Sequence, residues 1–259
     1  MKNVLITGAS SGIGEAYAKA FAKEGYRVIL VARREKVLEE VAKEIKEKYK
    51  GHSVVIPMDL SEENASVRLY EEVTKRNLQV DILINNAGFA TKGRLHESDF
   101  TKQQNELHVN IIALTELTHL FIRDMAKRKN GTIINVASAA AFNPVPFNAV
   151  YSSTKAYVLN FTQSLAYEYR KLGVRLMAVC PQATNTHFFD DFNKMKGKMR
   201  EPEDVVRTTM KALRGNKVVV TDGVMCYLQS LMHHFLSRKM IVRITGIVGE
   251  NIWGTQISH

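Results

Sequence analysis

Near the start of the chain stands Val4-Leu5-Ile6-Thr7-Gly8-Ala9-Ser10-Ser11-Gly12-Ile13-Gly14, an apolar run that passes straight into three glycines. The apolar run predicts a buried strand, and the residues from Glu15 onward follow the apolar spacing of a helix. Glycines at such a turn let the backbone approach a pyrophosphate, which the free amides at the helix N-terminus hold. The spacing Gly-x-x-x-Gly-x-Gly differs from the GxGxxG of ordinary dinucleotide-binding folds. The turn therefore predicts nucleotide binding, with a plain loop as the alternative, through Gly8, Ser10, Ser11, Gly12, Ile13 and Gly14.

Apolar strand-like runs alternate with amphipathic helical runs along the rest of the chain. This alternation predicts an α/β fold, a Rossmann-like doubly wound parallel sheet of about seven strands with helices on both faces. No linker or internal repeat interrupts it, so we expect a single dinucleotide-binding domain over residues 1–259, with residues 222–259 as a C-terminal helical extension. The expected strands lie near residues 3–7, 27–32, 53–58, 81–84, 131–137, 174–180 and 217–220. The expected helices lie near residues 12–24, 34–50, 62–77, 100–128, 149–172 and 202–214.

A second chemical signal is Tyr151-Ser-Ser-Thr-Lys155, within a predicted helix. An offset of four residues places the tyrosine and the lysine on one helix face, one turn apart. A free phenol has a pKa of about 10, and a neighbouring ammonium favours the phenolate and lowers that pKa. The pair is a candidate acid–base catalyst acting on a hydroxyl group, although the same spacing also occurs by chance on ordinary helices.

The two motifs together resemble the short-chain dehydrogenase/reductase family, in its shorter single-domain branch. Four further matches follow in the family's order, so that the resemblance covers residues 1–190. They are Asp59-Leu60 after the third predicted strand, Asn85-Asn86-Ala87-Gly88 after the fourth, Asn110 in the next helix and Ser138 at the end of the fifth strand.

The resemblance implies a site beyond the carboxyl ends of the strands, where ligands of such sheets bind. It implies that Tyr151 exchanges the hydroxyl proton, and that Lys155 lowers the pKa of Tyr151 and bonds the nicotinamide ribose. Ser138 would hold the substrate oxygen, and Asn110 would anchor a water that relays protons. A strand-end serine and a buried polar cap are the structural alternatives for these last two. The implied cofactor contacts also include Asp59, Leu60, Asn86, Ala87, Gly88 and Thr186.

The end of the second predicted strand indicates which nicotinamide cofactor is bound. The chain there reads Ala32-Arg33-Arg34. An acidic residue at this place holds the ribose 2′-hydroxyl of NAD, whereas an arginine accommodates the 2′-phosphate of NADP. Arg33 is the better candidate for the phosphate because it comes first after the strand, and Arg34 is placed to stack on adenine. Two solvated arginines are the alternative, but the helix dipole disfavours cations at a helix N-terminus. We therefore predict NADP.

Two features of the chain concern the substrate. After the sixth strand the family has Pro-Gly, whereas this chain has Pro181-Gln182, whose side chain we expect in the space next to the nicotinamide. Residues 187–200 fall where the family has a substrate lid and are rich in apolar side chains. They favour a lipophilic ketone or alcohol, and their packing on the protein body is the alternative. The apolar candidates are Phe188, Phe189, Phe192, Met195 and Met199.

The sequence thus predicts an NADP-dependent oxidoreductase that transfers a hydride between nicotinamide and a carbonyl or hydroxyl carbon. We expect it to reduce a lipophilic ketone or a 3-oxoacyl-type substrate. A non-catalytic NADP-binding protein with a regulatory or redox-sensing role is the alternative, which the intact Ser138, Tyr151 and Lys155 disfavour. A dehydratase or epimerase on the same fold is a further rival.

Composition narrows the partners. The chain has 259 residues, a formal net charge of +10 and two cysteines. No basic tract with interleaved aromatic residues occurs, so nucleic acid is not expected; a polyanionic cofactor, an acidic substrate or an anionic membrane surface explains the charge. The two cysteines suggest neither a disulfide framework nor a metal site. The chain enters its first strand without a signal peptide, so a cytoplasmic location is expected.

Two regions predict further contacts. The helices near 100–128 and 149–172 carry apolar residues on more than one face, which indicates a homodimer or homotetramer; a wide core-facing stripe on a monomer is the alternative. Residues 224–248 are apolar but too interrupted by charge for a membrane span, and predict one or two amphipathic helices. We expect these helices to cap the pocket mouth or contact a partner subunit. An anionic membrane surface and partial disorder are the alternatives.

Overall fold

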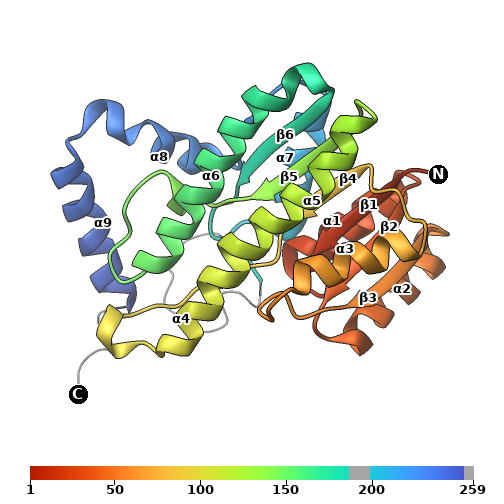
Figure 1. Ribbon diagram of the computed structural model, residues 1–259. Helices are drawn as coiled ribbons and strands as arrows, with labels where there is room; N and C mark the ends of the chain where they lie inside the picture. Colours follow the sequence, from red (N-terminus) through yellow and green to blue (C-terminus); the bar gives the residue numbers. More distant parts are fainter. Residues whose placement is uncertain (187–198, 254–259) are drawn as a thin grey trace.

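The computed structural model describes residues 1–186 and 199–253. At its centre is a seven-stranded sheet in the order β3-β2-β1-β4-β5-β6-β7, in which every neighbouring pair of strands is parallel (Figure 1). The doubly wound α/β sheet predicted from the sequence is confirmed. The strands are β1 (Asn3–Thr7), β2 (Arg27–Ala32), β3 (His52–Pro57), β4 (Ile82–Asn85), β5 (Gly131–Val136), β6 (Val174–Cys180) and β7 (Val219–Thr221).

Helices connect successive strands and continue beyond the last one. The α-helices of the described residues are α1 (Gly12–Lys23), α2 (Glu35–Tyr49), α3 (Ala65–Lys75), α4 (Phe100–Leu107), α5 (Leu114–Lys127), α6 (Ala149–Tyr169), α7 (Pro202–Leu213), α8 (Val224–Phe235) and α9 (Arg238–Trp253). A π-helical turn, His108–Ala113, joins α4 to α5, and short 3₁₀ turns are formed by Leu95–Glu97, Ala139–Ala141 and Arg170–Leu172.

Two helices differ from the sequence-based expectation. The helix expected near 62–77 begins at Ala65, because Asn64 adopts a left-handed conformation with φ of 58°, which asparagine tolerates better than most residues. The helix expected near 100–128 is interrupted by the π-helical turn His108–Ala113. Such turns insert one extra residue into an α-helix and occur frequently at functional sites.

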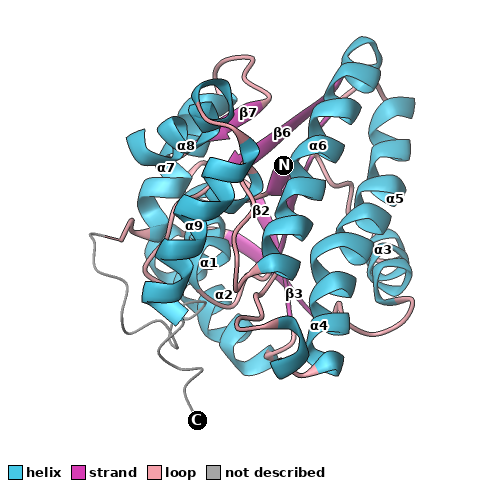
Figure 2. Ribbon diagram, turned by 90° about the vertical axis from the view of Figure 1, so that its left-hand side faces the viewer, coloured by secondary structure: helices cyan, strands magenta, loops and turns pink. Residues whose placement is uncertain are grey.

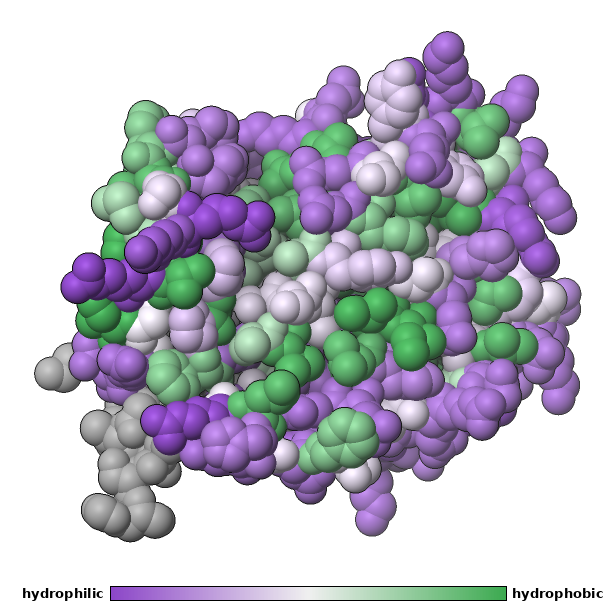
Figure 3. Space-filling view, turned by 60° about the vertical axis from the view of Figure 1, so that its left-hand side comes forward, coloured by the Kyte–Doolittle hydropathy of each residue, from purple (hydrophilic) through white to green (hydrophobic). Residues whose placement is uncertain are grey.

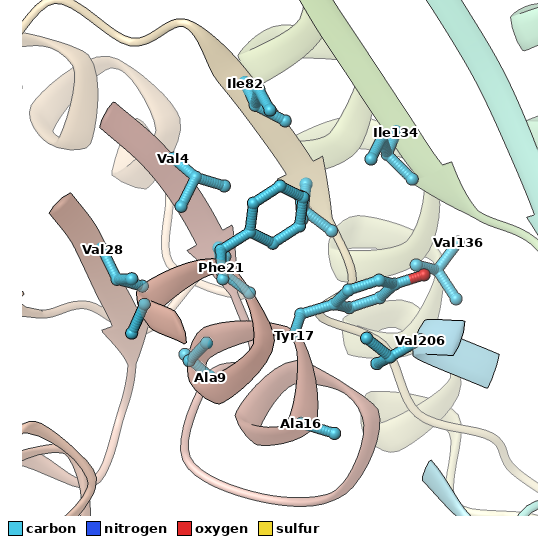
Figure 4. Close-up of a cluster of buried hydrophobic side chains, with 14 of the residues drawn as sticks. Val4, Ala9, Ala16, Tyr17, Phe21, Val28, Ile82, Ile134, Val136 and Val206 are labelled. Atoms are coloured by element: carbon cyan, nitrogen blue, oxygen red, sulfur yellow. The ribbon is translucent and has the colours of Figure 1, made fainter. Parts of the chain in front are cut away.

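Apolar side chains from both faces of the sheet form the core. One cluster joins the strands to α1, α2 and α7, and a second joins them to α3 and α5. Figure 4 shows the rings of Tyr17 and Phe21 from α1 among Val4, Ile82 and other strand residues. Tyr17 is fully buried, and its hydroxyl lies 2.7 Å from the Oγ1 of Thr209 in α7. The polar tip of this large ring is thereby satisfied inside the apolar core.

The sheet order reverses between β1 and β4, which are neighbours although β2 and β3 separate them along the chain. Ligands of open α/β sheets bind in the crevice at such a switch point, outside the carboxyl ends of the strands. The glycine-rich turn follows β1 and the Asn-Asn-Ala-Gly segment starts at the end of β4. The topology therefore brings these two motifs together.

The helices predicted to form an oligomer contact bury part of their apolar surface within the chain itself. Leu117 and Phe121 of α5 belong to the core, whereas Ile112 and Tyr157 remain exposed on the outer side. Tyr157 stacks on Phe161 with ring centroids 5.5 Å apart. A homodimer or homotetramer through α5 and α6 stays a prediction.

Candidate active site

The turn between β1 and α1 leaves no room for side chains at its glycines. Gly8 and Gly12 have φ of 68° and 58°, where glycine is favoured over other residues. A Cβ at Gly14 would lie 2.1 Å from the carbonyl oxygen of Gly8, and a Cβ at Gly12 would lie 2.8 Å from the Cγ2 of Thr186. Gly12 and Thr186 line a cavity of about 350 Å³. The first backbone amides of α1 have no hydrogen-bond partner within the helix, and they lie at this glycine turn.

The loop after β4 is tied to the glycine turn by hydrogen bonds. The Nδ2 of Asn86 donates to the carbonyl oxygens of Thr7 and Gly8 at 3.0 and 3.3 Å. The Oγ1 of Thr7 accepts from the backbone amides of Asn86 and Ala87, both at 3.0 Å. The two loops therefore form one unit, and Gly88 continues from it toward the catalytic residues.

The residues predicted to bind the adenosine end lie beside the glycine turn. The Nη2 of Arg34 donates to the Oγ of Ser10 at 3.3 Å, and both residues line a cavity of about 290 Å³ together with Ser11. The Arg33 side chain is 74% exposed, and its Nη1 lies 4.0 Å from the Oδ2 of Asp59. Two guanidinium groups next to a glycine-rich turn suit a phosphate group, which arginine binds in a forked geometry.

The predicted pair after β3 shapes the neighbouring loop. The Oδ1 of Asp59 accepts from the amide and the hydroxyl of Ser61 at 2.9 and 2.7 Å. Leu60 is buried, and its carbonyl oxygen lies 3.1 Å from the Nδ1 of His108. These contacts connect the adenosine side of the site to the π-helical turn.

Three of the predicted catalytic residues meet at the end of β5. The hydroxyl of Tyr151 hydrogen-bonds with the Ser138 side chain, and the Ser138 Oγ accepts from the amide of Ala140 at 3.1 Å. The Nζ of Lys155 donates to the carbonyl oxygen of Val136 at 2.9 Å and lies 5.6 Å from the centroid of the Tyr151 ring. The structure therefore places a serine, a phenol and an ammonium within one small volume.

Burial governs the protonation of this group. Burial raises the pKa of Tyr151 to about 12, while the hydrogen bond with Ser138 opposes the shift. Burial also lowers the pKa of Lys155 to about 8, opposed by the negative charge of Glu106. This differs from the expectation that the ammonium lowers the pKa of the phenol. The reason is that burial is the largest cause of the shift in the Tyr151 pKa.

The side chain of Asn110 connects α6, the helix that carries Tyr151 and Lys155, to the loop after β4. Its Oδ1 accepts from the amide of Phe89 at 3.2 Å, and its Nδ2 donates to the Phe89 carbonyl at 2.9 Å and to the Thr154 Oγ1 at 3.1 Å. A Cβ at Gly88 would lie 2.9 Å from the Asn110 Oδ1 and 3.4 Å from the Lys155 Nζ. The Asn110 side chain therefore caps local backbone next to Lys155, and its expected role in anchoring a water stays a prediction.

Glu106 is a charged residue of the site that the sequence analysis missed. Its side chain is fully buried, and its Oε2 accepts from the amide and hydroxyl of Thr91 at 2.8 and 2.5 Å. Its Oε1 has no hydrogen-bond partner among the residues that the structure describes. Burial raises the pKa of Glu106, although its bonds with Thr91 and the charge of Lys155 oppose the shift. The sequence did hold a signal for Glu106, because it precedes Asn110 by four residues and so falls on the same face of the predicted helix.

The Gln182 side chain contacts the C-terminal end of the sheet, and its expected place next to the nicotinamide stays a prediction. A Cβ at Gly223 would lie 3.0 Å from the Oε1 of Gln182, so the carboxamide lies against the junction between β7 and α8. Gly223 has φ of 91°, a conformation that favours glycine. The lack of a side chain at Gly223 therefore makes room for the glutamine that replaces the family's glycine.

Arg200 is the last residue of the segment expected to cover the substrate, and it is held in place by several contacts. It forms an isolated parallel bridge with Thr184, and its amide donates to the Ala183 carbonyl at 3.0 Å. Its guanidinium donates to both carboxylate oxygens of the buried Asp222 at 3.0 and 2.8 Å. Met199 is half-buried. The other predicted lid residues, Phe188, Phe189, Phe192 and Met195, lie outside the described residues.

The C-terminal extension forms two amphipathic helices, as the sequence predicted. Helix α8 packs against the 3₁₀ turn Ala139–Ala141 that follows Ser138, and the Nδ2 of Asn143 donates to the Gln229 carbonyl at 3.0 Å. The helices thus lie next to the loop after Ser138, and their role as a cap stays a prediction. None of the helices between residues 1 and 253 that the structure describes is long and apolar enough to cross a bilayer.

Comparison with known proteins defines the class. The family model described as short chain dehydrogenase matches residues 2–197. The chain therefore belongs to the short-chain dehydrogenase family, as its ordered motifs predicted, and is an oxidoreductase of that family acting on carbonyl or hydroxyl groups.

The chain is 31% identical to the human very-long-chain 3-oxoacyl-CoA reductase over 215 residues, which cover 81% of this chain and 67% of that protein. It is 31% identical to the ketoacyl reductase HetN of Nostoc sp., over 85% of this chain and 77% of that one. A short-chain dehydrogenase from Sphingobium yanoikuyae, solved in complex with NADPH, superposes with a TM-score of 0.83 at 27% identity, covering 90% of this chain and 93% of that chain.

Proposed function

We propose that this chain is an NADP-dependent ketoreductase that reduces the carbonyl group of a lipophilic ketone or a 3-oxoacyl-type substrate. The observation that carries the proposal is the contact between Ser138 and Tyr151 with Lys155 against the same ring. The alternative of a non-catalytic NADP-binding protein does not require this arrangement. The named activities of the human and Nostoc relatives support a ketoreductase.

The residues present fit a dinucleotide phosphate. The cradle at Gly8, Gly12 and Gly14 excludes side chains and presents helix amides, which bind pyrophosphate. Arg33 and Arg34 supply two cations for a 2′-phosphate. The similar enzyme from Sphingobium yanoikuyae was solved with NADPH. When NADPH is bound, its nicotinamide supplies a hydride to the carbonyl carbon.

Residues of the chain then stabilise the substrate oxygen and supply its proton. The Ser138 hydroxyl donates to the substrate oxygen and stabilises the negative charge that develops on it. A pKa of about 12 keeps the Tyr151 phenol protonated at neutral pH, so it is ready to give its proton to that oxygen. The ammonium of Lys155 stabilises the phenolate that remains until solvent returns the proton. A protonated phenol in the resting site favours reduction over oxidation.

The surroundings of Ser138 support a lipophilic substrate. The three residues that follow it, Ala139–Ala141, form a 3₁₀ turn without polar side chains. Phe142 packs onto the same apolar cluster. Ala139–Ala141 and Phe142 offer a small polar substrate few side-chain hydrogen-bonding groups. An acyl chain or a fused ring instead gains binding free energy when its apolar surface is buried against them.

The test is a panel of carbonyl compounds assayed by NADPH consumption, with 3-oxoacyl-CoA esters of several lengths, bulky ketones and small sugars. Longer 3-oxoacyl esters and bulky ketones should give the higher kcat/KM. Tyr151→Phe should lower kcat by at least about 10²-fold, as expected when a general acid is lost, with little change in the Kd for NADPH. Retention of most of the activity by Tyr151→Phe would sink the mechanism, and turnover confined to sugars would refute the substrate class.

A further inference from the structure

Helices α8 and α9 end the described chain with a large apolar surface that no other part of the described structure covers. Figure 1 shows them at the end of the molecule opposite to α2 and β3, and Figure 2, viewed from that side, shows α9 in front. Each helix is attached through a narrow inner face. Cys226 of α8 and Ile241 of α9 are buried, and Gly246 lies against Pro146.

The outer face of α8 is an apolar stripe. Cys226 points into the protein, and the exposed apolar residues lie on the opposite side of the helix at 100° per residue. Val224 is 75% and Phe235 82% exposed. Between the exposed first turn and Phe235, Leu231 and Met232 are half-buried and continue the apolar face. The stripe consists of Val224, Met225, Tyr227, Leu228 and Phe235.

Helix α9 combines a second apolar stripe with cations. Met240, Ile244, Ile247 and Val248 are each exposed by 42 to 53% and fall within one sector of the helix. Lys239 and Arg243 lie along one side of this sector, whereas Arg238, at the first position of the helix, lies on its other side. Figure 3 shows apolar side chains at its left-hand side, with strongly hydrophilic side chains lying among them.

This surface carries a net positive charge. Residues 224–253 contain three arginines and lysines and one acidic residue, Glu250, which is exposed near the end of α9. A second copy of the chain docked face to face would bring these cations together, and like charges across an interface are unfavourable. An anionic lipid surface instead accepts the apolar stripes among its acyl chains and the cations at its headgroups.

We propose that α8 and α9 form an interfacial hairpin, defined as residues 224–253, that lies flat on membranes containing anionic lipids. The hairpin rests on the surface without crossing it, in keeping with the lengths of the two helices. It does not depend on the proposed function. If both hold, the 3₁₀ turn after Ser138, against which α8 packs, lies close to the membrane from which a lipophilic substrate arrives.

The test is flotation of the full chain with vesicles of phosphatidylcholine and phosphatidylserine, and with vesicles of phosphatidylcholine alone. We expect binding to the anionic vesicles that weakens as salt is added, and much weaker binding to the neutral ones. The triple variant Arg238→Gln, Lys239→Gln, Arg243→Gln should lose at least about tenfold in affinity, since each cation near such a surface contributes about fivefold. Leu228→Gln with Phe235→Gln should weaken binding to both kinds of vesicle.

A matched control removes three exposed lysines from other helices. Lys43→Gln, Lys127→Gln, Lys171→Gln has the same net charge as the hairpin triple variant, and it should float like the unchanged protein. All variants should keep NADPH-dependent activity on a water-soluble ketone, which also reports correct folding. Equal losses in the control and hairpin variants, or no binding to either vesicle, would overturn the proposal. So would light scattering that shows an oligomer dissolved by the Leu228/Phe235 change while lipid binding is absent.

Discussion

Arg33 and Arg34 offer a quantitative test of the cofactor assignment. Their joint replacement by alanine should weaken NADPH and leave NADH nearly unchanged, because NADH lacks the 2′-phosphate. Hydrogen bonds to charged groups contribute about 1.5–3 kcal/mol each. Arg33 is 74% exposed, so solvent screens its share to less than about 1 kcal/mol. The pair together should therefore contribute about 2 kcal/mol, which is about thirtyfold in Kd.

The two arginines should not contribute equally. Arg34 donates to Ser10 within the cavity next to the glycine turn, whereas Arg33 lies near the carboxylate of Asp59. The sequence favoured Arg33 as the phosphate ligand, but these contacts favour Arg34, so Arg34→Ala alone should cost more NADPH affinity than Arg33→Ala. Fluorescence titration with NADPH and with NADH measures both Kd values, and the ratio of the two is the quantity to compare.

The control is Lys36→Ala with Lys43→Ala, which removes two exposed cations from the following helix, α2, and gives the same net charge. If this control loses as much NADPH affinity as the arginine variant, the effect is one of net charge. If the arginine variant keeps its NADPH affinity, or loses NADH to the same degree, the assignment of a 2′-phosphate site is wrong.

Three further predictions concern the catalytic group and its support. Ser138→Ala should lower kcat about 10²–10³-fold, the usual cost of losing one donor to a developing oxyanion, with an unchanged Kd for NADPH in titration. NADPH-driven reduction should decline above about pH 8, where Lys155 loses its proton. Glu106→Gln removes a negative charge that raises the pKa of Lys155, so the alkaline limb of the pH–rate profile should move to lower pH; an unmoved limb would contradict the coupling. Arg200→Met should lower the free energy of unfolding in urea by about 3 kcal/mol because the buried Asp222 loses its partner, and adding Asp222→Asn should recover part of that loss.

Much of the fold followed from local sequence. Two features depend only on residues that are close along the chain, and the sequence therefore predicts them. They are the glycine turn at Gly8, Gly12 and Gly14 and the alternation of strand and helix patterns. The ordered family motifs added Asn110, Ser138 and Tyr151. Their meeting beyond the carboxyl ends of the neighbouring strands β4 and β5 follows from the geometry of parallel strands, whose carboxyl ends lie at one edge.

What sequence could not supply depends on tertiary contacts. The pKa of Tyr151 is set mainly by burial, and burial is a property of all the elements packed around the ring. Glu106 looks like a helix-surface residue until the loop bearing Thr91 folds over it. The π-helical turn at Asn110 has the same local composition as an α-helix, and the space that the Gln182 carboxamide occupies depends on Gly223, a glycine far along the chain.

The pairing of Thr184 with Arg200 has a consequence for how this protein can change over evolutionary time. The chain enters and leaves the stretch between them at points that backbone bonds and Asp222 hold in place. Lengthening a stretch with fixed ends costs little, since the entropy of closure grows only with the logarithm of its length. Insertions, deletions and wholesale replacement there should leave the sheet and the proton-transfer residues undisturbed. The prediction that this stretch contacts the substrate then implies that its exchange between relatives would change substrate preference without changing the fold.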